Sequence, residues 1–88
     1  MVWELHLPAC QSLKDKRTIV KSLKDRLHNR FNVSVAETGH HDLWQRAELT
    51  AAVVSTDRRH AESVLREVDN LVAGADGARI VDTSTSYL

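Results

Sequence analysis

Residues 12–31 have the sequence SLKDKRTIVKSLKDRLHNRF. Its apolar residues recur at the spacing of one helix face, at Leu13, Ile19, Val20, Leu23, Leu27 and Phe31. Ser12 and Asp15 have the form of a capping box, in which the hydroxyl accepts an early backbone N–H and the carboxylate reaches back. The stretch therefore predicts an amphipathic helix over residues 13–30.

Strand patterns lie on both sides of this helix. Residues 2–7 alternate between apolar and polar side chains, and Pro8 ends the alternation. Residues 32–38 alternate again, and residues 46–55 do so after a loop at 39–45. These two later runs predict a hairpin.

The rest of the chain predicts a second helix and a last strand. Thr56 or Asp57 is expected to cap the helix, and the glycine-containing residues 74–77 to end it. Apolar residues between them again keep helical spacing, at Ala61, Val64, Leu65, Val68, Leu71 and Val72. Residues 78–87 are rich in β-branched side chains, which favours a strand.

The predicted order is strand, helix, strand, strand, helix, strand. Two βα units that share one sheet predict an α+β, ferredoxin-like fold: a four-stranded antiparallel sheet with both helices on one face. The side chains expected to face the helices are Trp3, Leu5, Leu7, Val33, Val35, Leu49, Val53 and Val81. The side chains expected on the open face are Glu4, His6, Asn32, Ser34, Glu48, Thr50, Asp82 and Ser84.

Length and composition limit the possible classes of protein. The 88 residues, 42% hydrophobic and 27% charged, predict one globular domain over residues 1–88. Cys10 is the single cysteine, so no internal disulfide can form, and we expect a cytoplasmic protein. No apolar run is long enough to cross a membrane, and the first residues do not resemble a signal peptide, so we expect no membrane partner.

The charges are balanced over the chain but separated along it. The chain has twelve Lys and Arg residues and twelve Asp and Glu residues, yet residues 1–30 hold seven of the cations and only three of the carboxylates. On the predicted first helix five basic residues fall within an arc of about 80°, from about 100° per residue. They are Lys14, Arg17, Lys21, Lys24 and His28. This row either contacts the phosphates of a nucleic acid or is a solvated helix face. In the second case the aliphatic parts of the Lys and Arg side chains cover the edge of the core.

The open face of the sheet argues against one mode of RNA binding. RNA-recognition modules of similar topology stack bases on aromatic side chains of that face. Here the predicted face carries Glu4, Glu48 and Asp82 and no aromatic residue. An RNA is therefore expected to bind on the helix side.

The loop at 39–45 holds the other candidate residues. His40, His41 and Asp42, with Glu37, could serve as metal ligands or a general base, but their spacing matches no metal motif, and an ordinary polar loop is the simpler expectation. Trp44 packs either onto its own domain or, with Leu43, against a partner subunit.

No catalytic or cofactor motif accompanies these residues. The chain has no glycine-rich phosphate loop, nucleophile elbow or zinc-protease motif. Cys10 lacks a partner thiol and is expected to be inert. We therefore predict no catalytic residue, no metal and no cofactor.

Three segments resemble the YlxP-like family of small bacterial proteins, a domain-of-unknown-function family. They are Leu5-His6-Leu7-Pro8 with Ser12-Leu13-Lys14-Asp15-Lys16-Arg17, then Asn29-Arg30-Phe31-Asn32-Val33-Ser34-Val35-Ala36-Glu37, and Asp42-Leu43-Trp44-Gln45-Arg46-Ala47. Cys10 and His41 depart from the family pattern. The resemblance implies a ferredoxin-like fold and a bacterial cytoplasmic protein. Because genes of this family often lie near translation factors, it also implies a connection with RNA or the ribosome.

Three hypotheses follow, in decreasing order of support. The first is a non-enzymatic protein that binds ribosomal RNA or the ribosome through the basic first helix. The second is a homodimeric interaction module that uses the 39–45 loop with Leu43 and Trp44. The third is an enzyme, placed last because no nucleophile, base and orienting group can be identified together.

Overall fold

The computed structural model describes residues 1–88 and contains six regular elements. In chain order they are β1 (Val2–His6), α1 (Leu13–Arg30), β2 (Ser34–Gly39), β3 (Arg46–Ala52), α2 (Arg58–Ala73) and β4 (Arg79–Ser84). The predicted element order is confirmed, and the bounds of α1 agree with those predicted. The strands are shorter than predicted, most clearly β3 and β4.

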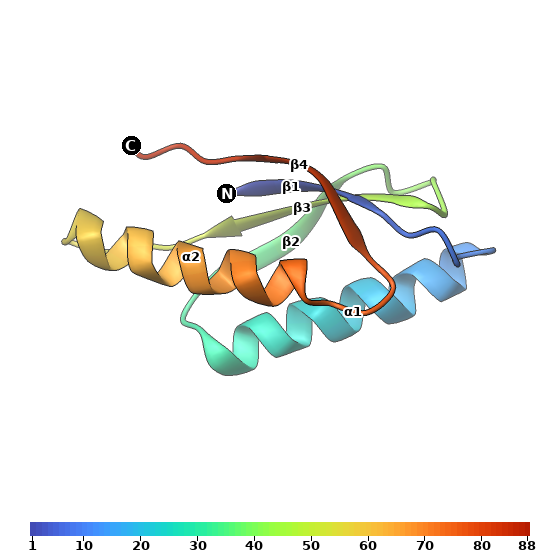
Figure 1. The fold of residues 1–88 in the computed structure, drawn as a ribbon, viewed down its shortest axis with the longest axis horizontal. Coiled ribbons are helices and arrows are strands. Elements are labelled where there is room, and N and C mark those ends of the chain that lie inside the picture. The colour runs from blue at the N-terminus through green and yellow to red at the C-terminus, as the bar shows by residue number, and fades with distance from the viewer.

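The four strands form one antiparallel sheet in the order β2-β3-β1-β4. Figure 1 shows α1 and α2 side by side on the same face of this sheet, while the opposite face is left uncovered. This is the α+β, ferredoxin-like arrangement that the sequence predicted. Strands β2 and β4 are the edges of the sheet. Neither helix is long and apolar enough to cross a membrane.

Local side-chain contacts explain where the helices begin. The Ser12 hydroxyl accepts a hydrogen bond from the Asp15 backbone N–H at 3.0 Å, as predicted for the start of α1. The Asp15 carboxylate in turn accepts the backbone N–H of Gln11, one residue earlier than in a standard capping box. Asp57, rather than Thr56, caps α2 by accepting the Arg59 backbone N–H.

The core lies between the helices and the covered face of the sheet. Most side chains predicted to face the helices do so: Trp3, Leu5, Leu7, Val33 and Leu49 are buried. Trp3 also donates its indole N–H to a carboxylate oxygen of Asp69 on α2, at 2.9 Å. This bond joins the central strand β1 to the second helix.

The prediction that Val81 faces the helices is wrong. A bulge between β1 and β4 pairs Glu4 with Asp82 but Leu5 with Ile80, so Val81 is the extra residue. Its side chain is 57% exposed, and Ile80 packs against the core in its place. A bulge changes the alternation of faces by one residue, and strict period-two counting does not anticipate it.

Candidate nucleic-acid interface

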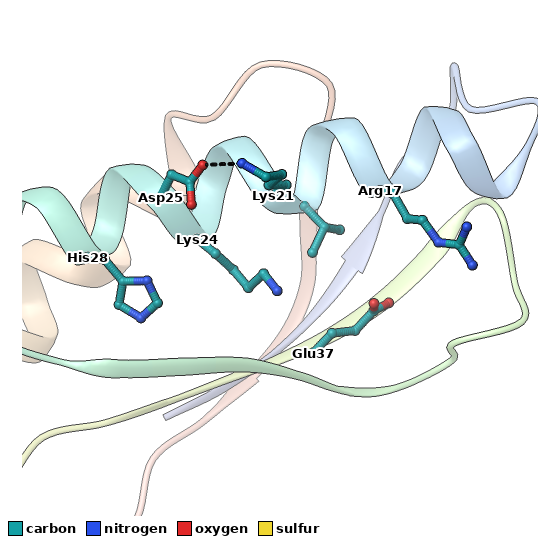
Figure 2. Close-up of a pocket in the computed structure, with 7 residues that line it drawn as sticks. Arg17, Lys21, Lys24, Asp25, His28 and Glu37 are labelled. Atoms are coloured by element: carbon teal, nitrogen blue, oxygen red, sulfur yellow. Dashed lines mark hydrogen bonds and ion pairs between the residues drawn. The ribbon is translucent and has the colours of Figure 1, made fainter.

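A groove of about 420 Å³ runs between α1 and the edge strand β2. Its lining is mostly charged and consists of Arg17, Val20, Lys21, Lys24, Asp25, His28 and Glu37. We call this the basic groove. Figure 2 shows its basic side chains on α1 and Glu37 extending toward them from the strand below. The fold thus brings together four of the five residues in the predicted basic row, whereas Lys14 is exposed and does not line the groove.

The cations of the basic groove differ in how they are paired. Lys21 contacts Asp25 one turn later, with Nζ and Oδ2 2.9 Å apart, and both side chains are largely exposed. Such exposed pairs contribute little stability and break easily. Arg17 and Lys24 form no ion pair. They are therefore the two cations best placed to meet an anionic ligand.

Another cation near the groove, Lys16, is buried. Lys16 is 1% exposed, and its ammonium donates to the backbone carbonyls of His40 at 2.7 Å, His41 at 3.3 Å and Arg46 at 3.3 Å. A buried ammonium is tolerated only when its donors are satisfied, and here three carbonyls satisfy them. Lys16 therefore holds the β2–β3 hairpin against α1.

Sequence reasoning missed this role, although a signal was present. The buried residues of α1 are Lys16, Val20, Leu23 and Leu27, spaced by four, three and four. Lys16 therefore occupies the first position of the buried stripe. A charged residue in an apolar stripe indicates a specific partner, because an unpaired buried charge costs several kcal/mol.

Glu37 is the carboxylate that accompanies Lys16. It pairs across the strands with buried Leu49, so its side chain points to the helix face of the sheet. One carboxylate oxygen, Oε2, lies 3.0 Å from the Lys16 ammonium. That contact is an ion pair without hydrogen-bond geometry, and Oε2 is buried and accepts no hydrogen bond.

The potential metal ligands do not converge. Glu37 faces Lys16, whereas His40 places Nε2 2.9 Å from the Glu4 carboxylate on β1. His41 contacts the backbone carbonyl of Glu37 at 3.1 Å. No group of three or more His, Cys, Asp and Glu side chains is arranged to hold a metal ion.

The tip of the hairpin is exposed. Leu43 is 48% and Trp44 52% exposed, so both are half-exposed and lie outside the core. The base of the hairpin is held by Lys16 and by the Gln45 amide, which donates to the Cys10 carbonyl at 3.1 Å. The tip therefore presents two large apolar side chains on a well-anchored loop.

A row of carboxylates crosses the open face of the sheet. Glu4 on β1 is opposite Glu48 on β3 and Asp82 on β4, so three carboxylates form a row across three strands. Arg46 and His40 both contact Glu4. Burial raises the pKa of Glu4, but hydrogen bonds from Arg46 and His40 outweigh it and lower the pKa below its ordinary value. The next position along the same face pairs His6 with Arg46 and Arg79, so cations stand beside the row of carboxylates.

Cys10 lies outside all of these surfaces. It is a free, buried cysteine. Burial raises the pKa of its thiol, which disfavours the reactive thiolate.

Comparison with known proteins confirms the resemblance seen in the three segments. Residues 1–85 match the family described as "Protein of unknown function (DUF503)". A 57-residue stretch is 44% identical to a protein of Bacillus subtilis (strain 168) described as "Uncharacterized protein YlxP". The matched stretch covers 65% of this chain and 62% of that relative, so it spans less than two thirds of the relative's length.

Proposed function

This chain belongs to the DUF503 family, and we propose that it is a non-enzymatic RNA- or ribosome-associated protein that binds through the basic groove. The observation that carries the proposal is the gathering of Arg17, Lys21 and Lys24 in one groove, two of them without an ion-pair partner. Affinity for nucleic acids depends largely on such contacts with phosphates.

The charge distribution supports one orientation of the ligand. The cations gather beside α1, whereas the open face of the sheet presents the row of Glu4, Glu48 and Asp82. Arg17 and Lys24 in the groove have no carboxylate partner, whereas Arg46 on the open face is paired with Glu4, so the groove is the surface that attracts an RNA chain more strongly. The RNA is therefore expected to follow α1 and the edge strand β2, away from the open face.

Co-sedimentation with ribosomal particles across a salt series tests the proposal. With three phosphate contacts, log affinity should fall with log salt at a slope of about −2 to −3. The variant Arg17→Gln/Lys24→Gln removes the two unpaired groove cations, while Gln keeps a similar helix propensity. Its slope should be shallower than that of the wild type by about 1.4–1.8.

A matched variant controls for net charge. Arg26→Gln/Arg66→Gln also removes two exposed cations without an ion pair, but both lie outside the groove. Its slope should stay close to that of the wild type. Equal slopes for the groove variant and the wild type, or no binding by the wild type at low salt, would contradict the proposal.

A second candidate function is favoured by one observation, the exposure of Leu43 and Trp44 at the hairpin tip. Tryptophan is enriched among the residues that anchor protein interfaces. A homodimer that buries these two side chains is the alternative proposal, and the oligomeric state of a Trp44 variant tests it.

A further inference from the structure

Glu37 is an unexpected residue for a phosphate-binding surface. Its side chain is 17% exposed and lines the basic groove, directly among the cations of α1 (Figure 2). The Lys16 ammonium 3.0 Å away offsets its charge, so the carboxylate adds a hydrogen-bond acceptor to the groove rather than a further site for phosphate. The groove is therefore better suited to a ligand that brings both an anionic group and a hydrogen-bond donor.

The acceptor capacity of Glu37 is unused. The ammonium of Lys16 donates its protons to the carbonyls of His40, His41 and Arg46, and contacts Glu37 only as an ion pair. Oε2 is buried and accepts no hydrogen bond, and Oε1 accepts none from any group of the chain. Because Oε2 is buried against Lys16, Oε1 is the acceptor that a donor entering the groove meets.

We propose that Glu37 selects the base of an unpaired nucleotide, by accepting a hydrogen bond from an exocyclic amino group while Arg17 and Lys24 hold the neighbouring phosphates. This inference rests on the proposed function and names its ligand class. Carboxylates recognise the amino group of cytosine in this way. Uracil has a carbonyl oxygen at the same position, which the carboxylate repels.

The two components of the groove predict separable effects on binding. The cations contact phosphates, which every nucleotide has, so they set affinity for all sequences alike. Glu37 contacts the base, so it sets the preference between bases. A cytidine hexamer and a uridine hexamer have the same charge and differ at the position that Glu37 is proposed to recognise.

Binding of these two hexamers to the full chain tests the inference. Wild-type protein should bind the cytidine hexamer about tenfold more tightly than the uridine hexamer, the worth of one hydrogen bond to a charged group. Glu37→Gln should reduce that ratio to about one, because an amide also donates to the uracil carbonyl. Lys24→Gln should weaken both hexamers while leaving their ratio unchanged.

Glu37→Gln leaves Lys16 without a counter-charge. If this variant fails to fold, a second experiment tests the inference by changing the ligand instead of the protein. Cytidine 5′-monophosphate and its N4,N4-dimethyl analogue are compared by NMR titration of the wild-type protein. The analogue lacks the amino protons and should lose about tenfold in affinity. Similar affinity for the monophosphate and the hexamer would identify a free nucleotide as the source of the ligand, and much tighter hexamer binding would identify RNA.

The outcomes separate this inference from the proposed function. Equal, salt-dependent binding of both hexamers would overturn the role of Glu37 and leave the groove as a phosphate-binding surface. No binding of either hexamer at low salt, together with no co-sedimentation, would overturn both.

Discussion

The interior and the rim of this domain use the same residue types in opposite ways. Lys16 and Lys24 are eight residues apart on α1, yet Lys16 is buried under the hairpin and Lys24 extends into the basic groove (Figure 2). The two tryptophans differ in the same way. Trp3 is buried in the core and bonded to Asp69, whereas Trp44 is half-exposed at the hairpin tip.

Environment, rather than residue type, determines whether these side chains contribute to stability or are available for recognition. An ammonium or an indole that is fully buried has its polar atoms committed to partners within the chain. The same group at the rim retains its capacity to bind. The candidates for function are therefore the cations and aromatic residues that the fold leaves uncommitted.

The tryptophans give the largest expected contrast. Trp3→Ala should lower the free energy of unfolding by about 3–5 kcal/mol, because it leaves a cavity and an unpaired Asp69 carboxylate. Trp44→Ala should change it by about 0.5 kcal/mol or less, since the side chain is exposed. Urea denaturation measures both values, and similar losses for the two variants would show that burial does not distinguish the two tryptophans.

The same Trp44→Ala protein tests the homodimer alternative. If Trp44 anchors a dimer, analytical ultracentrifugation should show a dimer for the wild type and a folded monomer for the variant. An unchanged mass in a folded variant would remove that role.

The lysines give the next largest contrast. Lys16→Met should lower the free energy of unfolding by about 3 kcal/mol, because it leaves Glu37 and three carbonyls without their cation. This is a large share of the roughly 4–13 kcal/mol expected for a domain of this length. Lys24→Met, the matched variant at the rim, should stay within about 0.5 kcal/mol. A Lys16→Met protein as stable as the wild type would show that the buried contacts do not hold the hairpin.

Glu4, which is partly exposed on the open face, should show the smallest effect. Its pKa is lowered in the folded protein, so its contribution to stability is fully present above its ordinary pKa of 4.5 and is lost as the pH falls through the lowered value. The stability difference between wild type and Glu4→Gln should therefore shrink as the pH falls below about 4.5. Denaturation at several pH values measures this, with exposed Glu67→Gln as the control. A difference that is constant with pH would mean that Arg46 and His40 do not stabilise the Glu4 carboxylate.

Local patterns by themselves determined the element order, the bounds of α1 and the separation of charge. Apolar residues between Leu13 and Leu27 recur with the period of a helix, and those in residues 2–7 recur with the period of a strand. Both periods follow from backbone geometry and from the exclusion of apolar groups from water. The basic row of α1 was predicted for the same reason, since a row on one helix depends only on spacing within that helix.

Tertiary structure alone decided which of these residues are available to a ligand. The burial of Lys16, the position of Glu37 in the groove and the exposure of Trp44 all depend on how the β2–β3 hairpin folds back against α1. Val81 is exposed because the pairing of β4 with β1 contains a bulge. These are contacts between residues far apart in the chain, and they arise from packing and from the satisfaction of buried polar groups, which no local spacing specifies.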